Sequence, residues 1–186
     1  MLLSKGQDYL YKKGVSRMQN NDHREAIEIY SQMIYRLAFS GTGNVHDAED
    51  ITQNVFYKLL KYRKQFNSEE HRKAWLLRVA VNEIKLFKRS GWFRKRDSNE
   101  LAEITDDTDP AILAENRMVH DAVMALKQEQ RMVVMLHYYY GYSTSEISAM
   151  TGIKEETVRT RIKRARTKLK NILKEEFDDE IGRAHV

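Results

Sequence analysis

The sequence contains no cysteine, which excludes disulfide bonds, cysteine-ligated zinc and thiol catalysis. Its 186 residues include eight glycines and a single proline, Pro110. Because these two residues mark tight turns, their scarcity argues against a β-rich protein and favours helices. No apolar run approaches the roughly 18–20 residues that span a bilayer, and the N-terminus lacks the apolar stretch of a signal peptide. These absences predict a helical protein of the cytoplasm with no membrane insertion of its own.

Basic residues, in contrast, are concentrated in two blocks. Residues 58–96 carry 13 basic and 3 acidic side chains, a net charge of +10. Residues 154–174 carry 9 basic and 2 acidic side chains, a net charge of +7. Residues 97–121 lie between the blocks and carry 1 basic and 8 acidic side chains, a net charge of −7. Two basic blocks indicate two sites for a polyanion such as nucleic acid, although a charge run alone is more often a solvated face.

Apolar residues recur at helical spacing through most of the chain, which predicts an all-α fold. A capping-box pattern at Asp22 and Glu25 predicts the start of the first helix. This helix and the next two need one another to bury their apolar faces, and then an acidic segment loses the periodicity. We therefore predict two small helical domains joined by a flexible linker. The predicted parts are an N-terminal extension (1–21), a first domain (22–92), an acidic linker (93–109), a second domain (110–177) and a tail (178–186).

The second domain has the pattern of a helix-turn-helix. A capping box at Ser143 and Glu146 opens a short helix, Gly152 suits a left-handed turn, and a basic helix starts near Lys154. At about 100° per residue one face of that helix is apolar; the residues expected to be buried are Val158, Ile162, Ala165 and Leu169. The residues expected to contact DNA on or beside the opposite face are Thr157, Arg159, Thr160, Arg161, Lys163 and Arg164. Arginine, lysine and threonine suit base edges and phosphates, although a surface helix with solvated lysines is the alternative.

Three segments resemble a known family. Residues 47–56 (DAEDITQNVF) resemble the acidic helix of sigma region 2, and residues 74–82 (AWLLRVAVN) resemble the tryptophan helix that follows it. Residues 157–166 (TVRTRIKRAR) resemble the recognition helix of sigma region 4. Because the three motifs occur in the family's order, the chain is identified over residues 22–174 as a member of the extracytoplasmic-function (ECF) group of sigma-70 family RNA polymerase sigma factors.

This resemblance implies a function and partners. In the family, region 2 binds the clamp helices of RNA polymerase and opens the −10 promoter element. Region 4 binds the −35 element and the polymerase flap, and many members are held inactive by an anti-sigma protein. We therefore expect a sigma factor for a stress or envelope regulon. It is not an enzyme, it needs no cofactor or metal, and it works with core polymerase, promoter DNA and an anti-sigma factor. The alternative is a stand-alone helix-turn-helix regulator that does not depend on core polymerase.

The resemblance also implies which residues make these contacts. The residues expected to bind core polymerase are Asp47, Glu49, Asp50, Gln53 and Asn54. Exposed acids suit a basic protein better than DNA, although an ordinary acidic surface is the alternative. The residues expected at the −10 element are Phe66, His71, Trp75, Arg78, Asn82, Lys85, Lys88 and Arg89.

Some details stay open at this point. Trp75 is either a core residue or a platform on which a base stacks. Four tyrosines just before the helix-turn-helix are expected to pack or cap between the last helices: Tyr138, Tyr139, Tyr140 and Tyr142. The chain departs from the family pattern at Asn54, where glutamate is frequent, and at residues 154–156, where it has Lys-Glu-Glu in place of Pro-Val-Gly.

Overall fold

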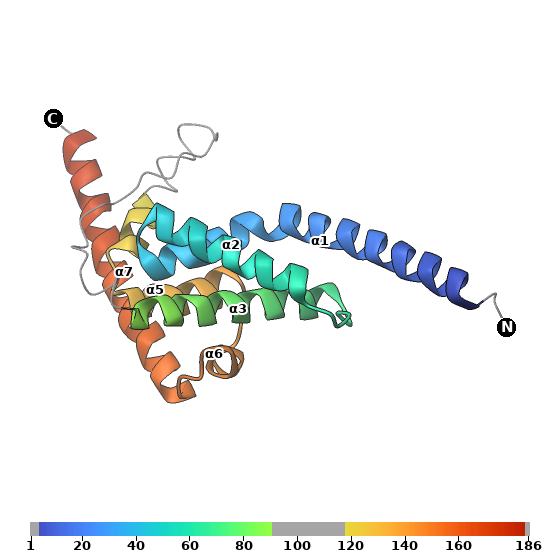
Figure 1. Ribbon diagram of the computed structural model, residues 1–186. Coiled ribbons are helices and arrows are strands. Elements are labelled where there is room, and N and C mark those ends of the chain that lie inside the picture. The colour runs from blue at the N-terminus through green and yellow to red at the C-terminus, as the bar shows by residue number, and fades with distance from the viewer. Residues whose placement is uncertain (1–3, 91–117, 185–186) are drawn as a thin grey trace.

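The structure, a computed structural model, describes the backbone of residues 4–90 and 118–184 and the side chains of residues 23–90 and 118–174. Within these ranges every regular element is helical (Figure 1), which confirms the predicted all-α fold. None of the described helices is both long and apolar enough to cross a bilayer. The elements are α1 (Ser4–Thr42), α2 (Val45–Lys61), α3 (Glu69–Arg89), α5 (Gln128–Val134), the π-helical turn η2 (Met135–Tyr139), α6 (Thr144–Thr151) and α7 (Glu155–Ala184), with a further helical stretch over 118–124. The predicted linker over 93–109 lies outside the described residues.

Helices α2 and α6 each begin directly after a polar residue whose side chain caps the helix N-terminus. The side-chain oxygen of Asn44 accepts a hydrogen bond from the Asp47 N–H at 3.1 Å and so begins α2. At α6, the Ser143 hydroxyl accepts from the Glu146 N–H at 3.3 Å, while the Glu146 carboxylate accepts from the Ser143 N–H at 2.8 Å. These bonds satisfy N–H groups that have no partner within the helix. Both the predicted capping box and the predicted turn are present, because Gly152 ends α6 with φ of 63°.

The first helix begins earlier than predicted. The pattern at Asp22 and Glu25 was expected to mark its start, but α1 runs without a break from Ser4 to Thr42. Its N-terminal half projects beyond the rest of the molecule (Figure 1). A capping pattern only offers partners to free N–H groups, and inside a continuous helix the preceding turn already supplies those partners. The start predicted at residue 22 was therefore wrong.

Helices α1, α2 and α3 form a bundle around one aliphatic core. Ile34, Val55 and Leu77 contribute fully buried side chains from the three helices in turn. Helices α1 and α3 approach closely at Gly41, where an added Cβ would lie 2.8 Å from Cγ2 of Ile84. Any larger residue at this point would push the two helices apart.

The last three helices complete this core rather than building a separate one. Helix α7 crosses one end of the bundle, with α5 and α6 beside it (Figure 1). Leu136 and Ile147 belong to the same buried cluster as the α1–α3 core. Among the residues whose side chains are described, a second, small cluster has three fully or nearly buried members, to which Leu169 adds partial cover: Leu126, Val134 and Ala165. The second half of the chain therefore shares its main core with the first half.

The tyrosine segment was predicted only in part. Tyr140 and Tyr142 pack against the core as expected, but Tyr138 and Tyr139 are 56% and 57% exposed. The π-helical turn η2 runs through these residues. Because such a turn fits an extra residue into the helix, it moves two of the rings away from the buried face.

Candidate nucleic-acid and protein interfaces

The helix α7 presents one buried and one open face, as the sequence predicts. Val158 and Ala165 are fully buried and Ile162 is nearly so, and these residues pack α7 against the molecule. The opposite face forms an open hollow lined by Thr160, Lys163, Arg164, Thr167, Lys168 and Asn171. Thr157 and Arg159 are also exposed. This polar row, half of whose residues are basic, has the length and chemistry to follow a DNA groove.

Two arginines of α7 are already engaged within the protein. Arg161 forms an ion pair with Glu129 of α5 at 2.7 Å, and its side chain is only 24% exposed. Arg159 forms an ion pair with Glu155 at 2.7 Å. Glu155 also accepts a hydrogen bond from the Thr144 hydroxyl, and that bond, followed by the one from Arg159, lowers the pKa of its carboxyl. Arg161 thus faces α5, away from the open hollow, and its expected DNA contact stays a prediction.

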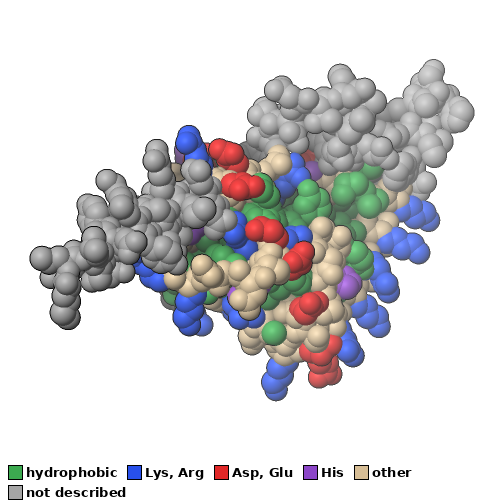
Figure 2. Space-filling view, turned by 90° about the vertical axis from the view of Figure 1, so that its right-hand side faces the viewer, with side chains coloured by type: hydrophobic (Ala, Val, Ile, Leu, Met, Phe, Trp, Pro, Cys, Tyr) green, Lys and Arg blue, Asp and Glu red, His purple; other side chains and the backbone are tan. Residues whose placement is uncertain are grey.

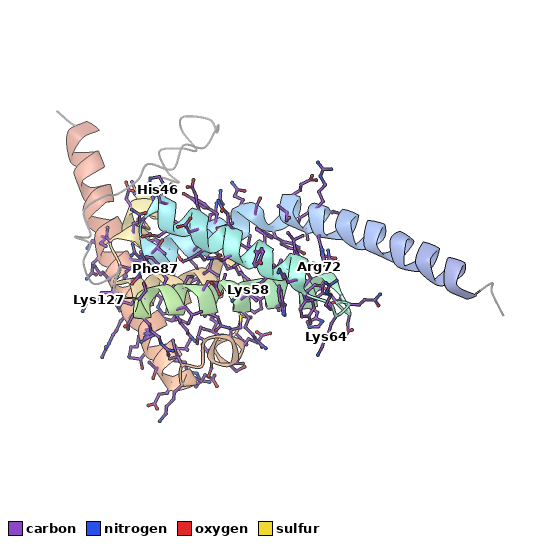
Figure 3. All side chains as sticks on the ribbon, viewed as in Figure 1. His46, Lys58, Lys64, Arg72, Phe87 and Lys127 are labelled. Atoms are coloured by element: carbon purple, nitrogen blue, oxygen red, sulfur yellow. The ribbon has the colours of Figure 1, made fainter. Side chains whose placement is uncertain are left out.

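The end of the bundle remote from α7 carries a cluster of aromatic rings. The ring centroids of Tyr62 and Phe66 are 4.8 Å apart, and those of Tyr62 and Trp75 are 4.6 Å apart. The Phe66 centroid lies 5.6 Å from both Trp75 and His71. Arg72 covers Phe66 from one side, with its guanidinium carbon 5.5 Å from the ring centroid. Figure 3 shows Arg72 and Lys64 at this end of the bundle.

The structure shows the packing role of Trp75, and its role as a platform for a base stays a prediction. The side chain is half-buried and packs against the core, yet it belongs to a partly open group of rings. Aromatic rings that are fixed by one another can stack on unpaired bases with little loss of conformational freedom. Our sequence reasoning named Phe66, His71 and Trp75 but missed Tyr62. Tyr62 could have been found from its position, because it is an aromatic residue at the C-cap of α2, four residues before Phe66.

The outer face of α3 divides into an open and a covered part. Arg78, Asn82 and Arg89 are exposed, and their spacing places them along one side of the helix. Lys85 instead points to α6, where its ammonium donates to the Thr151 carbonyl oxygen. Burial lowers the pKa of Lys85, and it also lowers the pKa of Lys88, although Glu129 acts to raise the latter. Two of the lysines expected at DNA thus lie against the second half of the chain.

Helix α2 carries the acidic row that the sequence predicts. Its exposed members are Glu49, Asp50, Gln53 and Asn54, and Asp47 is half-buried beside the N-cap. Ile51 and Val55 anchor the opposite side of the helix in the core. The row continues into Tyr57 and Leu60, which are 58% and 51% exposed and which the sequence analysis did not include. Figure 2 shows acidic side chains spread across the viewed face from top to bottom and basic side chains in a row along one edge.

Two family profiles match the chain. The profile for "Sigma-70 region 2" matches residues 26–94, and the profile for "Sigma-70, region 4" matches residues 116–169. The first match covers the aromatic cluster, the α3 face and the acidic row. The second match covers the helix-turn-helix and the start of α7.

Curated relatives include two ECF RNA polymerase sigma factors. SigE of Mycolicibacterium smegmatis is 32% identical over 156 residues, which are 80% of this chain and 60% of SigE. SigW of Bacillus subtilis is 28% identical over 189 residues, which are 90% of this chain and 99% of SigW. The chain therefore spans about three fifths of SigE and nearly the whole of SigW.

Solved structures show the same fold. The sigma factor RpoE in complex with the anti-sigma factor NepR from Bartonella quintana has a TM-score of 0.63 at 22% identity, covering 82% of this chain and 97% of RpoE. CnrH in complex with the cytosolic domain of CnrY has a TM-score of 0.53 at 22% identity, covering 83% and 89%. Since both profile matches fall on the two halves described above, in the family's order, and the relatives are ECF sigma factors, the chain belongs to the ECF group of the sigma-70 family.

Proposed function

We propose that this chain binds core RNA polymerase in the cytoplasm and directs it to promoters through their −10 and −35 elements. The polymerase supplies the chemistry, and the chain supplies the recognition. The observation that carries this proposal is the acidic row on α2, with Glu49 and Asp50 exposed on the same half of the chain as the aromatic cluster. A stand-alone regulator needs only the α7 face. Exposed carboxylates would be repelled by DNA but suit a basic protein partner.

At the −10 element, the proposed contacts come from the first half of the chain. Trp75 and Phe66 offer ring faces to an unpaired base, and Asn82 offers both a donor and an acceptor to a base edge. Arg78 and Arg89 lie on the same exposed side of α3 and would hold the phosphate backbone. The Nδ1 atom of His71 accepts a hydrogen bond from the Asn67 N–H at 3.3 Å, and the ring packs edge-on against Phe66, so its proposed role is to position the loop and the ring.

At the −35 element, the proposed contacts come from α7. Lys163 and Arg164 line the open hollow together with Thr160, and a guanidinium can bond a guanine through two hydrogen bonds. Thr157 and Arg159 lie one turn nearer the start of the helix, where residues of a recognition helix reach base edges. We propose the base contact for Arg164 in particular, because no ion pair with another described residue is seen for it, whereas Arg159 and Arg161 have partners within the protein.

An anti-sigma partner is part of this proposal. The structural neighbour RpoE was solved in complex with the anti-sigma factor NepR, and this chain shares its fold. We propose that a protein of that kind binds this chain and keeps it from the polymerase, and that the regulon serves a stress or envelope response.

Core binding by the α2 row gives the decisive experiment. Asp50→Lys reverses the charge of an exposed residue, which leaves folding intact and should weaken the affinity for purified core polymerase. Glu28→Lys is the matched control, because it makes the same charge change on the exposed surface of α1. Binding is measured by fluorescence anisotropy of labelled chain at two salt concentrations, since an ionic interface weakens with salt.

The two functions give opposite results in this experiment. A sigma factor binds core polymerase tightly, loses affinity with Asp50→Lys but not with Glu28→Lys, and supports transcription from a library of promoter fragments. A stand-alone regulator binds duplex DNA selectively without polymerase, and neither variant changes its activity. Equal core affinity of the two variants would contradict the role of the α2 row.

A further inference from the structure

A polar link formed by Tyr30, Glu69 and Arg72 joins helix α1 to the aromatic cluster. The Tyr30 hydroxyl donates to Oε2 of Glu69 at 2.9 Å, and Oε1 of Glu69 lies 3.3 Å from a terminal nitrogen of Arg72. Arg72 in turn covers one side of the Phe66 ring at the remote end of the bundle (Figure 3). The link therefore ties a ring proposed to meet the −10 element to a tyrosine that lies 39 residues before Glu69 in the sequence.

The members of this polar link are held in fixed positions. Tyr30 packs against the core, and burial, followed by the bond to Glu69, raises the pKa of its hydroxyl to about 12. The hydroxyl therefore remains a donor near neutral pH. The side chain of Arg72 is only 11% exposed, whereas that of Glu69 is 57% exposed. Because the carboxylate lies largely in water, the ion pair adds little stability, and its main effect is to orient the guanidinium.

Phe66 depends on side-chain contacts of this kind for its position. It lies in the segment between α2 and α3, so no helix fixes its backbone. Its ring stacks on Tyr62 and meets Trp75 and His71 edge-on. Arg72 adds a charged contact to these three aromatic contacts, and a change in the orientation of its guanidinium would change the support of the Phe66 ring.

A stack of rings does not by itself select a base. Stacking on an aromatic ring tolerates every base, because every base has a π-face, whereas selection needs a site held to within about 0.5 Å of one geometry. We propose that Tyr30 and Glu69 are positioning residues that hold Arg72 over Phe66 and thereby make the aromatic cluster selective for one base of the −10 element. This inference rests on the proposed role of the cluster at that element. Tyr30 acts through Glu69 and Arg72 and not by contact with DNA.

Two substitutions break the polar link at different contacts. Tyr30→Phe removes the hydroxyl and keeps the ring, while Glu69→Gln keeps an oxygen that can accept from Tyr30 and removes the charge that attracts Arg72. Arg72 is kept in every variant, because the loss of its charge would weaken phosphate contacts for a separate reason. Tyr140→Phe is the matched control, since it also removes a tyrosine hydroxyl bond to another element. That bond, to the Met33 carbonyl oxygen at 2.7 Å, does not lead to the aromatic cluster.

The first measurement is of base preference. Core polymerase with each variant transcribes a barcoded promoter library randomised across the −10 element, and the ratio between the best and second-best base is compared at each position. Tyr30→Phe should lower this ratio at one position by roughly two- to tenfold, the range that one hydrogen bond can supply. Glu69→Gln should lower it at the same position, and the double variant should lose no more than the larger single loss, because both act through one link. Tyr140→Phe should leave every ratio unchanged.

The second measurement is of the cluster itself, without DNA or polymerase. The sequence has two tryptophans, Trp75 and Trp92, so a Trp92→Phe background leaves Trp75 as the reporter. Acrylamide should quench Trp75 fluorescence more strongly in Tyr30→Phe and Glu69→Gln than in the parent, because Arg72 no longer supports the rings. Urea unfolding followed by circular dichroism gives the stability of each variant, including Tyr140→Phe.

The outcomes separate this inference from the proposed function. If the parent chain initiates at selected −10 sequences and Tyr30→Phe keeps the same ratios, the inference is wrong and the proposed function stands. Equal losses of base preference in Tyr30→Phe and Tyr140→Phe would show a loss of stability alone, and a lower ratio with unchanged quenching would show that Tyr30 does not act by positioning the rings. Either result overturns the inference. If the parent shows no −10 preference with core polymerase, both the inference and the proposed function fail.

Discussion

The two surfaces proposed to bind nucleic acid, one in each half of this sigma factor, are of different kinds. In the first half, the Trp75, Phe66 and Tyr62 rings contact one another and are supported by the bundle core. In the second half, Lys163 and Arg164 line an open hollow on α7 and reach into solvent. The rings of the first surface are already fixed, so binding costs them little conformational entropy. The long side chains of the second surface must lose conformational entropy when they contact a ligand. A preformed site suits unpaired bases, and adaptable basic side chains suit an intact duplex.

The two halves also differ in how they are stabilised. The first half contributes most of the shared buried core, while the second adds fewer residues to it and has a small cluster of its own around Leu126 and Val134. The stability of the second half should therefore depend more on the first half than the reverse. Four predictions test these contrasts, from the largest expected effect to the smallest.

The largest expected difference is in the free energy of unfolding lost when a side chain is truncated in each of the two buried clusters. Leu77→Ala removes a fully buried side chain from the shared core and should lower the free energy of unfolding by about 2–5 kcal/mol. Leu169→Ala removes a half-buried side chain that covers the small cluster, and its cost should be well below that. Urea unfolding followed by circular dichroism measures both. Equal costs would show that the second half has a core of its own.

Two glycines, one in each half, should resist substitution for different reasons. Gly41→Ala places a Cβ against Ile84 and should cost about 1–3 kcal/mol through overpacking. Gly141→Ala meets no atom within 4 Å, but Gly141 has φ of +78°, so its cost is backbone strain. Adding Ile84→Ala should reduce the stability cost of Gly41→Ala and leave the cost of Gly141→Ala unchanged. A double-mutant cycle measures this coupling, and additive costs at Gly41 would contradict the close approach.

The contrast between Arg164 and Arg161 tests the α7 face. Arg164→Ala should lose about 1–3 kcal/mol of discrimination at one or two −35 positions if the arginine bonds a base through two hydrogen bonds. Arg161→Ala breaks the pair with Glu129 and should lower stability while leaving base preference in place. Transcription with core polymerase from a library of −35 variants measures the base preference of both protein variants. A uniform loss for Arg164→Ala across all sequences would indicate a phosphate contact.

The smallest expected effect is the pH dependence of stability at the helix N-caps, which occur in both halves. Hydrogen bonds lower the pKa of Glu146 beside Ser143 and of Glu70 beside Ser68 from the usual 4.5. The stabilisation is therefore complete above about pH 4.5 and is lost as the pH falls through the lowered value. Glu146→Gln, which still fits a capping box, should flatten the acid side of the profile of melting temperature against pH. An unchanged profile would show that the cap does not depend on charge.

Much of this architecture follows from the sequence. The Ser143–Glu146 capping box, the turn at Gly152 and the buried face of α7 were all predicted, because they depend on contacts within a few residues of the chain. The acidic row on α2 and the aromatic residues Phe66, His71 and Trp75 were named with the help of the family resemblance, whereas Tyr62, which packs against Trp75, was missed. The start of α1 was not, since a local capping pattern at Asp22 does not act when the helix continues through it.

The sequence by itself determined the helical class, the order of the two regions and the faces of α2 and α7, because helical periodicity and capping are local properties. Only the tertiary structure decided which charged residues remain free. Arg161 and Arg164 lie three residues apart in one basic helix, yet only Arg161 is paired with Glu129 of α5. Lys85 and Arg89 lie one turn apart on α3, yet only Lys85 meets the end of α6. Such partners come from elements distant in the chain, and no local pattern encodes where these elements pack.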